Sequence, residues 1–144
     1  MKLEHILIPC DFSASTRAAI DYAVALTERF PAAVTLLHVI APFVGYGAEI
    51  SIIPDNAVVN RVQSAETRLK ELAAPVAGSV PAKTVCLRGQ PWQAICDWAA
   101  ENDVDLIVMP THGHSGILHM WLGSVSGRVV QKAPCPVLVV RGIE

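Results

Sequence analysis

Five short apolar runs, rich in β-branched residues, recur along the chain and are separated by proline, glycine or polar residues. Continuous apolar runs of this length predict strands that are buried on both faces, as in a parallel sheet. The predicted strands cover residues 5–8, 34–40, 83–87, 105–109 and 136–140.

Apolar residues between the first two runs recur at helical spacing and predict a helix that buries one face. Ser13 is the candidate N-cap of this helix. Its predicted buried face consists of Ala19, Tyr22, Ala23, Leu26 and Phe30.

Three further helices are predicted between the later runs. The second begins near Val58 and ends before the breakers Pro75, Gly78 and Pro81. Its apolar positions are Val62, Ala65, Leu69 and Leu72, and its solvated positions are Arg61, Glu66, Arg68, Lys70 and Glu71. The third begins at Pro91, because a proline suits the first turn of a helix, and runs to about Glu101. The fourth covers about 123–132.

Strands and helices therefore alternate along the whole chain. This alternation predicts an α/β fold in which a doubly wound, five-stranded parallel sheet of Rossmann-like type carries helices on both faces. Residues 1–144 are expected to form one domain. In such sheets ligands bind beyond the carboxyl ends of the strands, where the strand order reverses. The loops after the first and fourth strands are therefore the candidate site.

Composition and charge exclude several other classes. The 144 residues are 52% hydrophobic and 17% charged, which is typical of a packed globular protein. A formal net charge of −2 argues against non-specific nucleic-acid binding, which needs a basic face. No apolar run reaches the roughly 20 residues of a membrane-spanning helix, and the N-terminus does not resemble a signal peptide. We expect a cytoplasmic protein with neither nucleic-acid nor membrane partners.

The cysteines and histidines predict no metal site. Cys10, Cys86, Cys96 and Cys135 form no CxxC pair and are expected to be reduced and buried rather than disulfide-bonded. His112, His114 and His119 lie close together but match no zinc spacing. His38, at a strand end, is expected to be a hydrogen-bonded core residue.

The loop after the fourth strand is rich in glycine. Gly113, Gly116 and Gly123 precede Ser124 and Ser126 at a helix start. Backbone N–H groups and hydroxyls in this arrangement can cradle a phosphate at the positive end of a helix. The alternative is that the glycines only permit tight turns.

At this loop the sequence resembles the universal stress protein family. The family's nucleotide motif, G-x2-G-x9-G-[ST], is matched at Gly113, Gly123 and Ser124. The resemblance covers nearly the whole chain. Its other blocks are Ile6-Leu7-Ile8-Pro9-Cys10-Asp11-Phe12-Ser13, Leu37-His38-Val39, Gly89-Gln90-Pro91, Asp105-Leu106-Ile107-Val108-Met109 and Ala133-Pro134-Cys135-Pro136-Val137-Leu138-Val139-Val140-Arg141.

The resemblance implies an adenine nucleotide alpha-hydrolase-like fold with a pocket for ATP or AMP, and with Mg²⁺ carried through the phosphates. Asp11 would contact the ribose or adenine side, although an Asp at this position is also a common helix cap. Val39 would offer backbone groups to the base, and Gly123 would meet the phosphates. The implied nucleotide-binding residues are Pro9, Cys10, Asp11, Val39, Met109, Thr111, His112, Gly113, His114, Gly123, Ser124, Val125 and Ser126.

Two positions depart from the family pattern. Pro110 replaces the first glycine of the motif and removes a backbone N–H donor. His114 stands where relatives often carry Arg or Lys, and it is a weaker, pH-dependent cation. Both changes are expected to weaken triphosphate binding more than monophosphate binding.

Two segments suggest contacts with other chains. Residues 43–54 form a long apolar connection, which is expected either to bind an unknown protein partner or to cover the domain's own helices. The same two alternatives, a partner contact or a cover over the domain's own helices, apply to Met120 and Trp121. The last strand, from Pro136 to Val140, is expected at a sheet edge, where the resemblance implies a homodimer. Alternatively, Pro134 and Pro136 only protect that edge.

The sequence favours an adenine-nucleotide-binding dimer that senses or signals in a stress response. It shows no activated nucleophile, paired carboxylates or Walker lysine, so rapid catalysis is not expected. One alternative is a nucleotide-independent interaction protein whose pocket is impaired by Pro110. Another is a slow ATPase or self-phosphorylating protein that uses Ser124 or Ser126.

Overall fold

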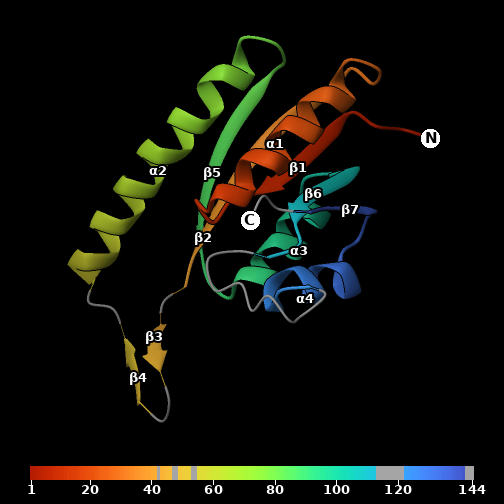
Figure 1. The fold of residues 1–144 in the computed structure, drawn as a ribbon. Coiled ribbons are helices and arrows are strands. Elements are labelled where there is room, and N and C mark those ends of the chain that lie inside the picture. The colour runs from red at the N-terminus through yellow and green to blue at the C-terminus, as the bar shows by residue number, and fades with distance from the viewer. Residues whose placement is uncertain (42, 47–48, 53–54, 113–121, 142–144) are drawn as a thin grey trace.

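The computed structural model describes residues 1–41, 43–46, 49–52, 55–112 and 122–141. Its centre is a five-stranded sheet in the order β5-β2-β1-β6-β7 (Figure 1). Every neighbouring pair in this sheet is parallel. The strands are β1 (His5–Pro9), β2 (Ala33–Ile40), β5 (Ala82–Arg88), β6 (Leu106–Pro110) and β7 (Val137–Val140). The predicted doubly wound fold is confirmed.

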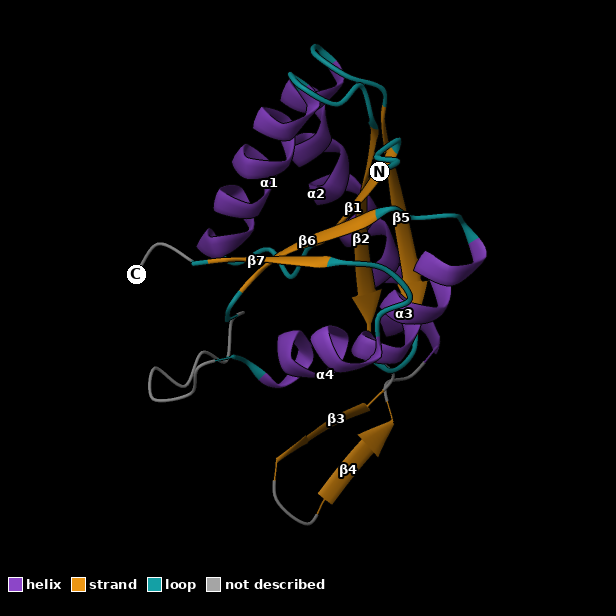
Figure 2. Ribbon diagram, turned by 90° about the vertical axis from the view of Figure 1, so that its right-hand side faces the viewer, coloured by secondary structure: helices purple, strands orange, loops and turns teal. Residues whose placement is uncertain are grey.

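Four helices cover the two faces of this sheet. Helices α1 (Ala14–Thr27) and α2 (Asp55–Ala77) lie on one face, and α3 (Pro91–Glu101) and α4 (Ser124–Lys132) lie on the other (Figure 2). Alternate strand residues supply the two core layers: Ile6 and Ile8 pack on the α1 side, whereas Leu7 and Ile107 pack on the α3 side. All four side chains are fully buried, which explains the continuous apolar runs.

The buried face of α1 differs from the predicted one. Tyr22 is 58% exposed, and Phe30 lies beyond the helix and is 36% exposed. The side chains that face the sheet are Thr16, Ala18, Ala19, Ile20 and Ala23. Small residues dominate this face because they let the helix approach the sheet closely, so the larger aromatic rings are left at the periphery.

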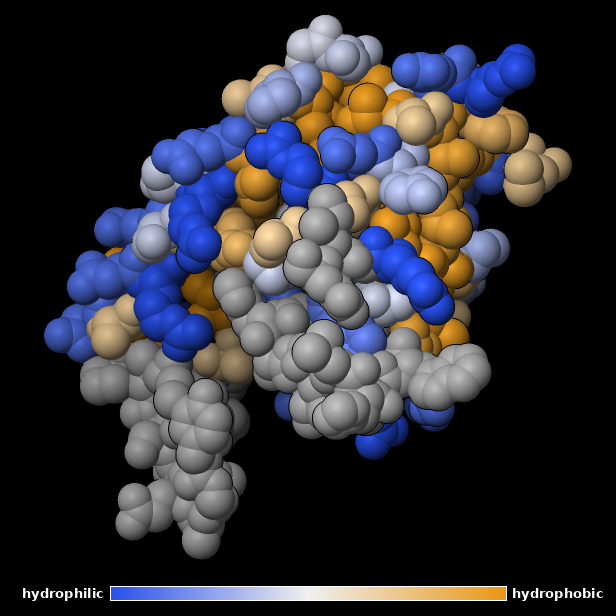
Figure 3. Space-filling view, in the orientation of Figure 1, coloured by the Kyte–Doolittle hydropathy of each residue, from blue (hydrophilic) through white to orange (hydrophobic). Residues whose placement is uncertain are grey.

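Helix α2 continues through Pro75, where the sequence predicted its end. Pro75 is exposed, so the carbonyl that loses its intrahelical donor lies on the solvated side, where water can replace the missing bond. The next residue, Val76, is only 3% exposed and packs in the core, which holds the last turn in place. The solvated face is confirmed, and hydrophilic residues cover the outward side of α2 (Figure 3).

The connection before α2 contains a β-hairpin rather than a continuous loop. Strands β3 (Phe43–Tyr46) and β4 (Glu49–Ile52) pair antiparallel and form a separate two-stranded sheet. The hairpin extends away from the five-stranded sheet in both views (Figures 1 and 2). Polar and apolar residues alternate in β4, Glu49-Ile50-Ser51-Ile52, which is a local signal for a strand, whereas β3 shows no such alternation.

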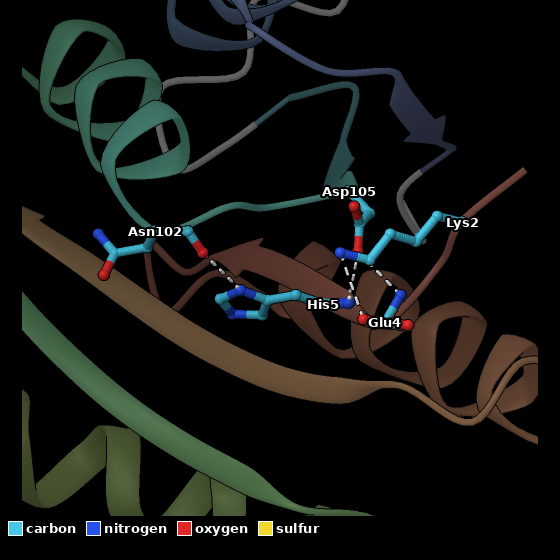
Figure 4. Close-up of polar contacts among 5 residues, drawn as sticks. All are labelled: Lys2, Glu4, His5, Asn102 and Asp105. Atoms are coloured by element: carbon cyan, nitrogen blue, oxygen red, sulfur yellow. Dashed lines mark hydrogen bonds and ion pairs between the residues drawn. The ribbon is translucent and has the colours of Figure 1, made fainter.

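Side chains tie together the strands at the amino end of the sheet (Figure 4). Asp105 Oδ2 accepts hydrogen bonds from the backbone N–H groups of Glu4 at 2.8 Å and His5 at 3.0 Å. His5 Nδ1 donates to the carbonyl of Asn102 at 3.0 Å, and its Nε2 lies 2.8 Å from Thr35 Oγ1. These contacts brace the end of the sheet opposite the candidate site.

Among the described helices, we find no apolar segment of the length needed to cross a membrane.

Candidate functional site

The candidate site lies at the carboxyl ends of β1 and β6, which are neighbours in the sheet. From β1 the chain crosses to β2 on one side, and it later returns through β6 on the other side. The strand order therefore reverses between β1 and β6, as the sequence predicts for a ligand site.

Strand β1 ends beside Leu37 of β2, so the backbone of Val39, two residues further along β2, faces the candidate site. The last bond between β1 and β2 runs from the Cys10 N–H to the Leu37 carbonyl at 2.7 Å. Because backbone groups alternate sides along a strand, Leu37 and Val39 point the same way. The Ile40 carbonyl points the other way, where it accepts a bond from Gly89 at 3.0 Å. In the described part of the chain, Val39 therefore directs its N–H and C=O to the side that β1 has left.

Phe12 turns the chain away from the sheet. Its φ of 65° lies in the left-handed region, which is uncommon for a residue that is not glycine. This turn places Asp11 Oδ1 where it accepts hydrogen bonds from the Ser13 N–H at 2.9 Å and the Thr16 hydroxyl at 3.1 Å. Asp11 thus has the capping role that its position suggested.

Ser13 occupies the predicted N-cap position, but its side chain makes no capping bond. Its hydroxyl oxygen is buried without a hydrogen-bond partner in the structure. The predicted N-cap residue is confirmed, but its side chain leaves the first N–H groups of the helix uncapped, and the Asp11 carboxylate accepts from the N–H of Ser13 itself.

Cys10 is buried and His38 is half-buried beside this turn. Cys10 is 5% exposed, and its Sγ donates to the Ile8 carbonyl at 3.3 Å. Burial, reinforced by the charge of Asp11, raises the pKa of the Cys10 thiol to about 12, so it is a neutral filler at physiological pH. His38 Nδ1 donates to the Cys10 carbonyl at 2.6 Å, and burial lowers the pKa of His38. The predicted hydrogen bond of His38 is confirmed, whereas its predicted place in the core is not, because the side chain is half-buried at the edge of the core.

Helix α4 begins against the end of β6. The Gly123 N–H donates to the Thr111 carbonyl at 2.7 Å, and the Ser126 hydroxyl donates to the Pro110 carbonyl at 2.8 Å. The N-cap residue is Gly123, so the start of the helix has no side-chain cap. Ser124 is exposed there, whereas Ser126 is 4% exposed. The first N–H groups of a helix lack intrahelical partners, so this end can receive an anion.

The remaining candidates divide between buried, half-buried and undescribed positions. Met109 is 3% exposed and packs in the core beneath α3 and α4. His112 Nδ1 lies 3.2 Å from Thr111 Oγ1. Gly113 and His114 lie outside the described residues. So do Gly116, His119, Met120 and Trp121. Within the described ranges, no three His, Cys, Asp or Glu side chains converge as a metal site would require.

The cysteines follow the prediction in part, because all are unpaired but only two are buried. All four are free: Cys10 and Cys96 are buried, and Cys86 and Cys135 are half-buried.

Comparison with known proteins identifies the family. A model of the universal stress protein family matches residues 2–141. The chain belongs to this family. A universal stress protein of Methanocaldococcus jannaschii is 36% identical over 139 residues, covering 94% of this chain and 81% of that protein. Another, from Bacillus subtilis, is 33% identical over 144 residues, covering 94% and 97% of the two chains.

Solved structures of universal stress proteins share the fold. A second Methanocaldococcus jannaschii protein superimposes with a TM-score of 0.84 at 25% identity, covering 100% of this chain and 99% of that one. An Arabidopsis thaliana family member with AMP bound gives a TM-score of 0.66 at 19% identity, covering 97% and 92%. A universal stress protein in complex with cAMP gives 0.65 at 23% identity, covering 99% and 100%.

Two features beside this universal stress protein's candidate site carried no signal in the sequence, the backbone turn at Phe12 and the position of the Arg68 side chain. The Arg68 guanidinium lies over the Phe12 ring, with Cζ 4.0 Å from the ring centroid. Phenylalanine has no preference for positive φ, so its position in the sequence carried no signal for the turn. Arg68 was visible only as part of a solvated helix face.

Proposed function

We propose that this universal stress protein binds an adenine nucleotide at the carboxyl ends of β1 and β6. The observation that carries the proposal is the backbone of Val39, whose donor and acceptor face the space that β1 leaves. An adenine edge also presents a donor beside an acceptor, so the two can pair as in a strand ladder. The neighbouring structures bound to AMP and to cAMP support the same ligand class.

The phosphates are proposed to meet the start of α4. Gly123 brings backbone to the surface without a side chain, and the exposed Ser124 adds a hydroxyl. The helix dipole favours negative charge at this end. The Ser126 proton is committed to the Pro110 carbonyl, so Ser124 is the more accessible of the two serines. Mg²⁺ would enter with the phosphate oxygens.

Asp11 is proposed to contact the ribose or base as well as to cap α1. The other proposed lining residues, carried over from the family resemblance, are Pro9, Cys10, Met109, Thr111, His112 and Val125. Gly113 and His114 complete the proposed loop by the family motif. Nucleotide binding is proposed to serve sensing or signalling in a stress response. The protein is proposed to act as a cytoplasmic homodimer.

The test is the identity of the nucleotide released from freshly purified protein by heat or acid. We expect ATP, ADP or AMP in near-stoichiometric amount, detected by ion-pair chromatography. Protein that contains none, and that binds none in calorimetry at millimolar ligand, would overturn the proposal.

A second candidate function is binding of a protein partner without nucleotide. The β3–β4 hairpin favours it, because a two-stranded ribbon that extends from a domain is only marginally stable alone. Deletion of 43–52 separates the two functions: nucleotide binding survives the deletion if the site at β1 and β6 is the functional one.

A further inference from the structure

A three-layer stack connects α2 to the turn that borders the proposed site. The Phe12 ring lies between the His38 ring, at 4.5 Å between centroids with an interplanar angle of 37°, and the Arg68 guanidinium at 4.0 Å. The three side chains come from the β1–α1 turn, the end of β2 and the middle of α2. Phe12 and His38 are half-buried and Arg68 is exposed, so the guanidinium closes the stack on its solvent side.

The stack restrains a backbone conformation that phenylalanine does not favour. A positive φ at a bulky residue is costly and persists only when its surroundings hold it. The same turn directs the Asp11 carboxylate to the Ser13 N–H, and the other side of the stack rests on His38, one residue before Val39. The position of the Asp11 carboxylate therefore depends on the turn that the Phe12 ring stabilises, and the same ring packs on His38 beside Val39.

We infer that Arg68 is a positioning residue of the nucleotide site, which acts by holding the Phe12 ring against His38. This inference rests on the proposed function, and it adds a residue from α2, a helix that supplies none of the predicted nucleotide contacts. Arg68 acts through the Phe12 ring and the turn that directs the Asp11 carboxylate.

The central experiment measures AMP and ATP affinity by calorimetry in the wild-type protein and in Arg68→Ala, Arg68→Lys and Lys70→Ala. We expect Arg68→Ala to weaken binding about three- to tenfold, the range of one cation–π contact. Arg68→Lys keeps a cation over the ring and should recover part of the loss. Lys70→Ala removes an exposed positive charge from the same helix and should leave affinity unchanged, which separates positioning from net charge.

A double-mutant cycle adds the decisive comparison. In a Phe12→Leu background, Arg68→Ala should cause no further loss, because the ring that it holds is absent. An equal loss in both backgrounds would overturn the inference, as would an Arg68→Ala variant that binds like the wild type.

Two measurements on the protein without nucleotide test the role of Arg68 independently of nucleotide binding. Burial is the main cause that lowers the pKa of His38, the Cys10 carbonyl and Asp11 raise it, and Arg61 and Arg68 add smaller lowering effects. Arg68→Ala should therefore raise the His38 pKa in an NMR titration and accelerate amide exchange at Ser13. Unchanged exchange at Ser13 would overturn the restraint on the turn. If the wild-type protein binds no nucleotide, the proposed function fails. Faster exchange of the Ser13 amide in Arg68→Ala would then show that Arg68 only stabilises the turn.

Discussion

The Gly123 N–H donates to the Thr111 carbonyl at 2.7 Å, which joins the start of α4 directly to the end of β6. This bond closes the glycine-rich segment at its base and places the uncapped helix end beside β6. The positive end of the helix dipole is thereby directed to the reversal point of the sheet.

Gly123→Val should abolish nucleotide binding while the fold persists. Gly123 has φ −64°, a conformation that valine tolerates, so the substitution adds volume where backbone would approach phosphate. Calorimetry with AMP and ATP checks the loss. Gly127→Ala is the matched control, because a Cβ there would lie 3.9 Å from Leu122 Cβ, an ordinary contact. Wild-type affinity in Gly123→Val would show that phosphate lies elsewhere.

Pro110→Gly should strengthen ATP binding more than AMP binding. The substitution restores an N–H, worth about 1 kcal/mol for a neutral hydrogen bond and up to about 3 kcal/mol for one to a charged group. Pro110→Ala restores the donor without the conformational freedom of glycine. Similar selective gains in both variants would assign the effect to the donor, and equal gains for ATP and AMP would limit the role of Pro110 to loop shape.

Val139→Lys should dissociate the proposed homodimer. Strand β7 is at the sheet edge, as predicted, and Val139 is half-buried and pairs with Met109 on the inner side. A lysine would place a charge in an apolar contact between two edge strands. Light scattering at micromolar concentration measures the mass. Val130→Lys, at a 43% exposed position on α4, is the control. A monomeric wild-type protein would refute the dimer.

Alkaline pH should destabilise the fold partly through Cys10. The folded thiol has a pKa of about 12, raised from 9.0, so only the unfolded chain releases this proton between those values. The contribution to stability is complete below pH 9 and falls by about 1.4 kcal/mol per pH unit above it. Urea unfolding from pH 8 to pH 11 should show a shallower decline for Cys10→Ala than for the wild type. Parallel curves would contradict the raised pKa.

Local pattern predicted most of the sheet and its helices correctly, because strand burial and helix periodicity are properties of neighbouring residues. Pro91 marked the start of α3, and alternation of elements predicted parallel pairing. The end of α2 was misplaced because Pro75 breaks a helix only when its turn lacks other support, and the burial of Val76 supplies that support. The exposure of Tyr22 likewise depended on how closely α1 approaches the sheet.

Residue pattern and motif spacing were enough to predict the parallel α/β fold, the reversal point between the first and fourth predicted strands, and the family motif that ends at Gly123 and Ser124. The direction of the Val39 backbone groups depends on the tertiary structure, since it requires β1 to leave the sheet after Cys10 while β2 continues. It also decided that Arg68 meets Phe12, 56 positions apart in the sequence. Residue spacing predicts which face a single helix or strand buries, whereas the candidate site forms where the ends of several helices and strands meet.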